Sequence, residues 1–173
     1  LASGPPPLVA TFGSAPVGDA QAVRAAVTRA ARRAGLRLVI QAGWAGLGDP
    51  GPVDDDVFIA GHVPHDWLFE HAGVVAHACG AGTTAAVVRA GVPHVPVPVM
   101  MDQPFWARRL HALGVAPRPI PITSLDERHL TQALRAVVRD RGFADTARGL
   151  AAAVATEDGN GRAADAIEAL PTR

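Results

Sequence analysis

The stretch that decides the fold is HACGAGTTAAVVRAGVPHVPVPVMMDQPFW, which covers residues 77–106. A Gly-rich turn is followed by a predicted helix over residues 83–90, which Gly91 and Pro93 end. An apolar segment and then an Asp-Gln pair come next. A strand, a helix and a second strand in close succession are typical of a parallel sheet with helical crossovers.

The same alternation extends over the rest of the chain. It predicts a Rossmann-like, doubly wound α/β domain, a parallel sheet with helices on both faces. In such sheets ligands bind beyond the carboxyl ends of the strands. We predict strands at 7–14, 36–41, 57–61, 73–78 and 94–99, with a further short strand at 116–121. We predict helices at 20–35 with Asp19 as N-cap, within 62–72, and at 83–90, 103–113, 124–141, 143–156 and 161–170.

Length and composition fit a single domain with a sizeable core. The chain has 173 residues, 49% of them hydrophobic, and 16 basic side chains balance 16 acidic ones. This balance argues against nucleic-acid binding, which needs a clustered basic face. We expect no membrane span and no signal peptide. One cysteine, Cys79, fits a reducing compartment, so we expect a cytoplasmic protein.

The turn CGAGTT, residues 79–84, is a candidate phosphate site. Glycines allow close approach of an oxygen, the first N–H groups of a helix lack partners, and threonine hydroxyls can donate. An ordinary strand-to-helix turn capped by threonine is the alternative. No Lys follows the last glycine, so the turn is not a P-loop, and it does not match the dinucleotide fingerprint.

The pair Asp102 and Gln103 follows the strand predicted at 94–99. A carboxylate and an amide suit adjacent sugar hydroxyls. The alternative is that Asp102 caps a helix that has Pro104 in its first turn.

Other chemistries fit the sequence poorly. The spacing of four histidines and the cysteine matches no usual zinc site, so we expect no metal. The segment FGSAP, around Ser14, is not a nucleophile elbow.

Together, these segments resemble a known family. The stretch VFIAGHVPHDWLFEHAGVVAHACGAGTTAAVVRAGVPHVPVPVMMDQPFWARRLHALG, residues 57–114, is similar to the donor-binding half of GT-B glycosyltransferases of the UDP-glycosyltransferase superfamily. It is most similar to the bacterial natural-product and sterol branch. VATFGS and QAGWAGL extend the resemblance more loosely over most of the chain.

The resemblance implies a binding role for three groups of residues. The nucleobase and ribose would contact His62, Val63 and His65. The donor sugar would contact Asp102 and Gln103. The diphosphate would contact Ser14, Gly80, Ala81, Gly82, Thr83 and Thr84, with His77 as a further candidate.

One position departs from the family pattern. Relatives carry a histidine immediately before the residue that matches Cys79, and here that position is Ala78. His77 lies one residue earlier, where a strand would turn its side chain to the opposite face. Ala86 also stands near the place of an acidic ribose ligand that some relatives have.

The resemblance implies that residues 1–173 are the C-terminal, donor-binding half of a two-domain enzyme whose N-terminal acceptor domain is absent. The catalytic base would lie in that domain, so we expect no catalytic residue in this chain and no cofactor. The expected reaction is inverting transfer from a UDP- or TDP-sugar to a hydroxyl of a natural product, such as a macrolide or polyketide. Two alternatives stay open: a non-catalytic auxiliary protein, for which Ala78 is the motive, and a nucleotide-sugar epimerase. The oligomeric state is not predicted.

Overall fold

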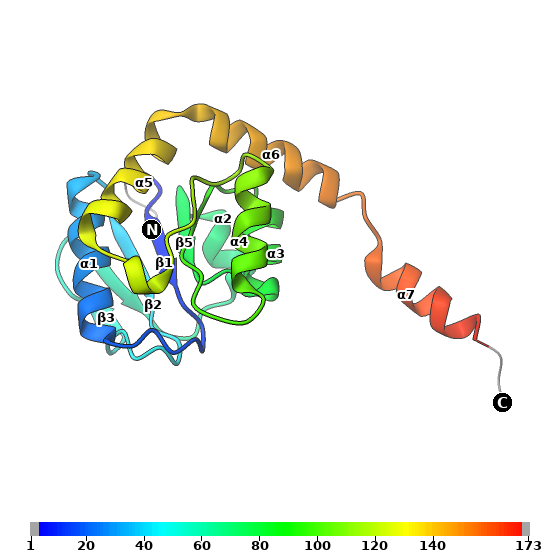
Figure 1. Cartoon of the computed structure of the whole chain (residues 1–173), viewed down its shortest axis with the longest axis horizontal. Coiled ribbons are helices and arrows are strands. Elements are labelled where there is room, and N and C mark those ends of the chain that lie inside the picture. The colour runs from blue at the N-terminus through cyan, green and yellow to red at the C-terminus, as the bar shows by residue number, and fades with distance from the viewer. Residues whose placement is uncertain (1–3, 171–173) are drawn as a thin grey trace.

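A six-stranded sheet forms the centre of the computed structural model, which describes residues 4–170 (Figure 1). The strands lie in the order β3-β4-β2-β1-β5-β6. Neighbours from β4 to β6 are parallel, whereas β3 at the edge is antiparallel to β4. The predicted doubly wound fold is confirmed, but the sheet is not parallel throughout, because β3 is an antiparallel edge strand where no strand is predicted. The strands are β1 (Leu8–Thr11), β2 (Leu38–Gln41), β3 (Gly51–Pro52), β4 (Val57–Ala60), β5 (Val74–His77) and β6 (His94–Pro96).

Helices cover both faces of the sheet. Helices α1 and α5 pack on one face in a first hydrophobic cluster, and α2 and α3 pack on the other face in a second cluster. A third cluster joins α4 and α6 beside the turn that leads into α3. The helices are α1 (Ala20–Arg33), α2 (His65–Glu70), α3 (Ala81–Ala90), α4 (Gln103–Ala112), α5 (Glu127–Arg139), α6 (Arg141–Val154) and α7 (Gly159–Glu168), with a 3-10 turn at Ile122–Ser124.

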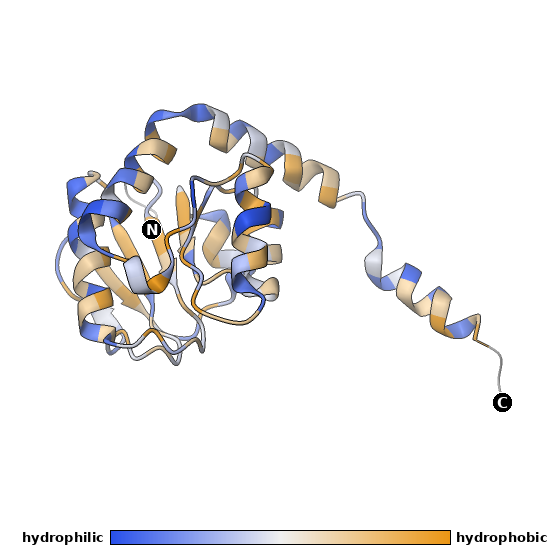
Figure 2. Cartoon of the chain, viewed as in Figure 1, coloured by the Kyte–Doolittle hydropathy of each residue, from blue (hydrophilic) through white to orange (hydrophobic). Residues whose placement is uncertain are grey.

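The central strands are hydrophobic on both sides, as a sheet between two helical layers requires. In β1, Leu8 and Ala10 enter the first cluster, and Val9 enters the second. The same alternation holds in β2 and β5. Figure 2 shows the hydrophobic strands inside a shell of helices whose outer faces are hydrophilic.

The ends of the helices follow the signals in the sequence. The Asp19 carboxylate accepts a hydrogen bond from the Ala22 N–H at 2.9 Å, so the predicted N-cap is confirmed. Gly91 ends α3 in the left-handed conformation, with a φ of 66°. Helix α3 begins at Ala81, two residues earlier than predicted, so Gly80 is its N-cap and Gly82 lies in its first turn.

We expect Asp19→Ala to lower the free energy of unfolding by about 1 kcal/mol, because the first turn of α1 loses its cap. Urea denaturation followed by circular dichroism measures this change. The control is Asp158→Ala, which removes a similar bond to the Gly161 N–H at the start of α7, a helix with no buried residues. Its expected effect on unfolding of the body is below about 0.5 kcal/mol. An equal loss in both variants would contradict the argument.

The strand predicted at 116–121 is absent from the described structure. The chain does run beside β6, since the Ile120 N–H donates to the Pro96 carbonyl and the Ile122 N–H donates to the Pro98 carbonyl. Residues 117, 119 and 121 are prolines without an N–H, so a regular ladder cannot form on both sides. Pro98 likewise lies just beyond the end of β6, which is shorter than predicted.

Helix α7 projects away from the body at the end of α6 (Figure 1). Ile167 in this helix and Leu170, two residues beyond its end, are exposed, with 68% and 66% of their surface accessible. The described residues therefore supply no partner for the apolar side chains of this helix.

Candidate functional site

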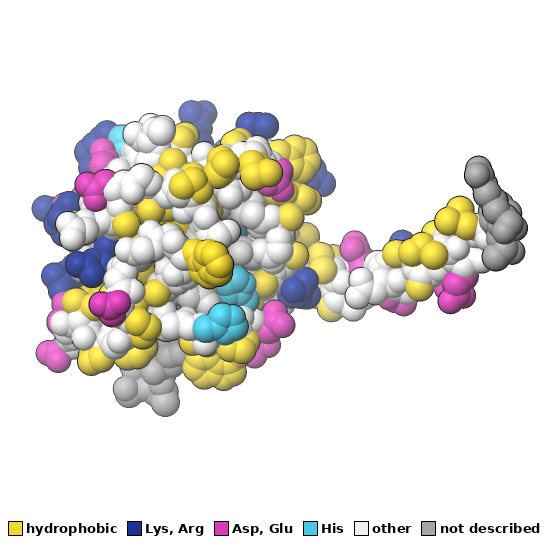
Figure 3. All heavy atoms as spheres, turned by 90° about the horizontal axis from the view of Figure 1, so that it is seen from below, with side chains coloured by type: hydrophobic (Ala, Val, Ile, Leu, Met, Phe, Trp, Pro, Cys, Tyr) yellow, Lys and Arg dark blue, Asp and Glu magenta, His cyan; other side chains and the backbone are white. Residues whose placement is uncertain are grey.

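The carboxyl ends of the parallel strands meet at one edge of the sheet, the lower edge in Figure 1. Figure 3 views the molecule from this side, and histidine side chains lie there next to hydrophobic ones. The predicted binding residues follow four different strands, β1, β4, β5 and β6. The fold therefore brings all of them to this edge.

The turn between β5 and α3 leaves the helix N-terminus open. Gly80 is the N-cap of α3 and makes no side-chain cap. A Cβ added at Gly80 or Gly82 would meet no atom within 4 Å, so packing within the chain does not require glycine there. Ala81 and Gly82 are exposed. The unpaired N–H groups of this first turn, with the positive end of the helix dipole, form a candidate anion site.

The two threonines of this turn differ in exposure. Thr83 is partly buried, whereas Thr84 is buried, and its Oγ1 has no hydrogen-bond partner among the described residues. The open part of the predicted diphosphate site thus consists of Gly80, Ala81, Gly82 and Thr83.

The loop after β1 places Ser14 next to this turn. Strands β1 and β5 are neighbours, and Thr11 pairs with His77. Ser14 and Gly80 each lie three residues beyond that pair, and Ser14 is exposed. Ser14 and the α3 N-terminus therefore lie at the same edge, just beyond the ends of neighbouring strands.

A tryptophan that we did not predict as a site residue lies near Ser14. The backbone N–H of Trp44 donates to the Gly13 carbonyl at 3.0 Å, and Trp44 is 92% exposed. Gly43 has a φ of 52°, and a Cβ there would lie 2.8 Å from the Gly13 oxygen, so the two loops approach closely only with glycine. The sequence signal was a tryptophan between small residues in a loop after a strand.

The predicted nucleobase turn is held by a glutamine that the sequence analysis missed. The Gln41 side-chain amide donates to the Val63 carbonyl at 2.9 Å. Its oxygen accepts from the Thr11 hydroxyl at 3.0 Å and from His65 Nε2 at 2.8 Å. Gln41 therefore connects the ends of β1 and β2 to this turn, whose third predicted residue, His62, is exposed.

His65 is oriented by this network and by an aromatic contact. Its ring stacks on Phe69, with ring centroids 4.8 Å apart. Burial lowers the pKa of His65 below its ordinary value, against the opposing effect of Asp66. The ring is therefore neutral at neutral pH, with its proton on Nε2, which donates to Gln41.

Asp102 and Gln103 stand at the start of α4. Asp102 occupies the N-cap position, but its side chain makes no cap; its Oδ2 instead accepts from Trp106 Nε1 at 2.8 Å. Gln103 Oε1 accepts from the N–H groups of Val99 and Met100 at 2.8 and 3.0 Å. These bonds fix both side chains and leave the Gln103 amide N–H groups and the second Asp102 oxygen available to a ligand.

The His77 side chain does not reach the open side of the turn. Its ring is fully buried, and its two nitrogens bond to the Cys79 N–H and to His94. Burial lowers the pKa of His77 to about 3. This leaves His77 without a free nitrogen for a diphosphate. Ala78 is also buried, but in the first cluster, on the other side of the sheet.

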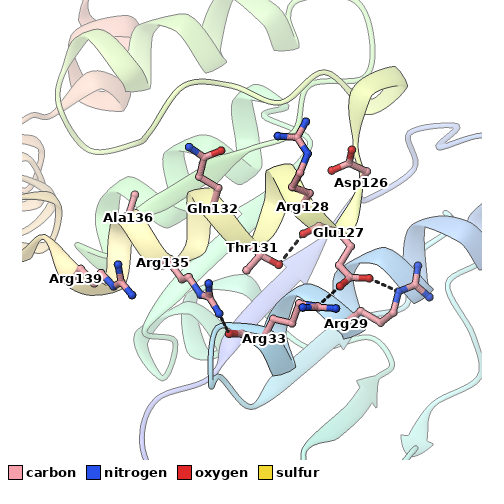
Figure 4. A pocket seen from close by; sticks show the side chains of 10 residues that line it. All are labelled: Arg29, Arg33, Asp126, Glu127, Arg128, Thr131, Gln132, Arg135, Ala136 and Arg139. Carbon is pink, nitrogen blue, oxygen red and sulfur yellow. Dashed lines mark hydrogen bonds and ion pairs between the residues drawn. The ribbon is translucent and has the colours of Figure 1, made fainter.

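The groove drawn in Figure 4 lies between α1 and α5, away from this edge. Five arginines line it: Arg29, Arg33, Arg128, Arg135 and Arg139. Arg29 and Arg33 both pair with Glu127, and Arg135 donates to the Arg33 carbonyl. Arg29, Arg33 and Arg135 thus join α1 to α5, and no predicted site residue lines the groove.

Two further properties bear on the candidate chemistry. Within residues 4–170, no group of three or more His, Cys, Asp or Glu side chains is placed to hold a metal ion. No helix in this described part is both long and apolar enough to cross a membrane.

The fold, together with the residues at the carboxyl ends of its strands, defines the class of protein. It is a doubly wound α/β domain with an open helix N-terminus between two polar turns. Residues 36–170 match the family described as "Erythromycin biosynthesis protein CIII-like, C-terminal domain". The chain therefore belongs to this family of glycosyltransferase C-terminal domains.

Relatives with curated names agree. The chain is 40% identical over 159 residues to sterol 3-beta-glucosyltransferase UGT80A2 of Arabidopsis thaliana, covering 92% of this chain and 25% of that protein. It is 39% identical over 170 residues to O-mycaminosyltylonolide 6-deoxyallosyltransferase of Streptomyces fradiae, covering 97% and 39%. The chain thus spans well under half the length of both relatives.

A solved structure agrees as well. Spinosyn rhamnosyltransferase SpnG in complex with thymidine diphosphate superposes with a TM-score of 0.75 at 27% identity, covering 96% of this chain and 46% of that one. The same enzyme has been solved with spinosyn aglycone. The fold is that of the C-terminal half of a GT-B glycosyltransferase.

Proposed function

We propose that this chain binds the donor in an inverting glycosyltransferase that transfers a sugar from a UDP- or TDP-sugar to a hydroxyl of a natural-product acceptor. The observation that carries the proposal is the uncapped α3 N-terminus with open space at Gly80 and Gly82. It lies between the His62–His65 turn and the Asp102–Gln103 pair, so nucleobase, diphosphate and sugar would lie in that order along the edge.

The chain itself would stabilise the leaving group. When the bond to the sugar breaks, negative charge grows on the diphosphate, and the N–H groups of Gly80 to Thr83 are already fixed to donate to it. The free Gln103 amide and Asp102 oxygen would hold the sugar hydroxyls. The base that deprotonates the acceptor would come from an N-terminal domain outside this chain, and attack opposite the diphosphate would invert the anomeric carbon.

Helix α7 is consistent with donor binding by this chain and acceptor binding by another domain. Its apolar side chains have no partner in the described structure, and the relatives are much longer than this chain. We propose that Ile167 and Leu170 contact the acceptor half of the complete protein. SpnG was solved with its aglycone, which supports a small-molecule acceptor of natural-product type.

A second candidate is a non-catalytic auxiliary protein that binds a nucleotide sugar or a partner enzyme. Ala78 favours it, because its side chain offers no hydrogen-bond donor and is buried. Turnover by a protein that includes the N-terminal half, without any other enzyme, would exclude this candidate.

Calorimetric titration of this chain with UDP, TDP and their glucose conjugates tests the proposal. We expect saturable binding, and Asp102→Ala should weaken binding of the sugar conjugates alone, by at least tenfold, because a hydrogen bond to a charged group is worth about 1.5–3 kcal/mol. Asp145→Ala on α6 is the control and should bind like the parent. Binding by Ala78→His but not by the parent would favour the auxiliary candidate. The absence of binding by every variant, all of them folded, would count against a donor site in this chain.

A further inference from the structure

The turn that leads into α3 contains an unusual backbone conformation. Cys79 has a φ of 66°, in the left-handed region that non-glycine residues rarely adopt. Its side chain is fully buried in the third hydrophobic cluster, and burial raises the pKa of its thiol to about 12. The thiol is therefore unreactive, and the conformation of this residue needs a structural explanation.

His77 supplies a bond that holds this conformation. The Cys79 N–H donates to His77 Nδ1 at 3.2 Å, within a wholly buried environment. Because Nδ1 accepts, the proton of the neutral ring must be on Nε2. His77 Nε2 then donates to His94 Nδ1 at 2.9 Å.

His94 is fixed by its own strand. It begins β6, its backbone N–H donates to the Val115 carbonyl, and its side chain is fully buried. With its Nδ1 accepting, its proton is on Nε2, which has no partner among the described residues. The direction of both bonds is thus determined: His77 accepts from the turn and donates to β6. The reverse direction would leave His77 without a ring proton.

We infer that His77 is a positioning residue for the α3 N-terminus: held by His94, it turns the Cys79 N–H inward and so directs the following N–H groups of Gly80 to Gly82 toward the open side. The inference rests on the proposed function for the identity of the ligand, and on geometry alone for the role of His77. His77 itself would not contact the nucleotide sugar. It acts through the backbone of Cys79.

The decisive test is rescue by glycine, which adopts positive φ without a supporting bond. We expect His77→Leu to weaken binding of UDP and of inorganic pyrophosphate by about tenfold, equivalent to about 1.4 kcal/mol. The affinity of the double variant His77→Leu/Cys79→Gly should recover to within about threefold of the parent. A threefold difference in affinity corresponds to less than half of that free energy. His77→Asn should also bind nearly like the parent, because its side-chain oxygen can still accept from the Cys79 N–H.

A readout without ligand separates this inference from the proposed function. The amide NMR resonance of Gly82 should move in His77→Leu and return in the double variant, whether or not a nucleotide binds. If nothing binds but the resonance behaves in this way, the proposed function fails and the positioning role stands.

Three results would overturn the inference: unchanged affinity and Gly82 resonance in folded His77→Leu, no recovery in the double variant, or equal behaviour of His77→Asn and His77→Gln. The comparison of His77→Asn with His77→Gln keeps the test decisive if His77→Leu does not fold. Glutamine places its amide near the position of Nε2 and cannot replace Nδ1, so His77→Gln should bind as weakly as we expect for His77→Leu.

Discussion

Phe69→Ala should lower the free energy of unfolding by about 3–5 kcal/mol, the usual range for truncation of a fully buried phenylalanine. Phe69 lies in the second hydrophobic cluster, between α2 and the sheet, with none of its surface exposed. Helix α2 has six residues, of which only Leu68 and Phe69 are buried, so the remaining contacts can fill little of the cavity. Urea denaturation followed by circular dichroism measures the loss.

The same change should also disturb the turn above it, because the Phe69 ring stacks on His65. Phe105→Ala is the control: this ring is 56% exposed, and its loss should cost less than about 1 kcal/mol. Similar losses in the two variants would show that α2 contributes less to the core than its burial indicates.

Gly82→Ala should have opposite effects on stability and on binding. Alanine in the first turn of α3 meets no atom of the chain and has the higher helix propensity, so stability should rise by up to about 1 kcal/mol. The new methyl group would occupy the open space in which the proposed diphosphate would approach the N–H groups. The affinity for UDP or TDP should therefore fall by at least tenfold, about 1.4 kcal/mol.

Gly149→Ala is a matched control for this effect. Gly149 is also a helical glycine with nothing within 4 Å of an added Cβ, but it lies in α6. Gly149→Ala should raise stability by a similar amount and keep the parent affinity for UDP or TDP. Urea denaturation and calorimetric titration measure these two quantities. If Gly82→Ala bound the nucleotide as tightly as Gly149→Ala, the diphosphate would not lie on the α3 N-terminus.

Local signals in the sequence predicted much of the fold. The apolar strands, the Asp19 cap and the Gly91 stop all depend on residues within a few positions of each other. The two-residue strand β3 could not be predicted, because Gly51 and Pro52 are ordinary loop residues that pair only because β4 passes beside them.

The placement of residues at the edge was predictable, but their bonds were less so. The bond from Trp106 to Asp102 spans four helical positions and could have been anticipated. The Thr11–Gln41 bond joins residues 30 positions apart, and its existence depends on the register of β1 against β2. The His77–His94 bond likewise depends on the pairing of Val75 with His94, which no local pattern encodes.

The position of helix α3 between two hydrophobic clusters also has a thermodynamic consequence. Ala86 and Val87 pack toward α2 and the sheet, while Val88 packs toward α4 and α6. The helix is thus immobilised on two sides, so its N-terminal N–H groups would lose little conformational entropy on binding the proposed ligand. The enthalpy of the new hydrogen bonds would then appear in the affinity with only a small entropic offset, which is the advantage of preorganisation.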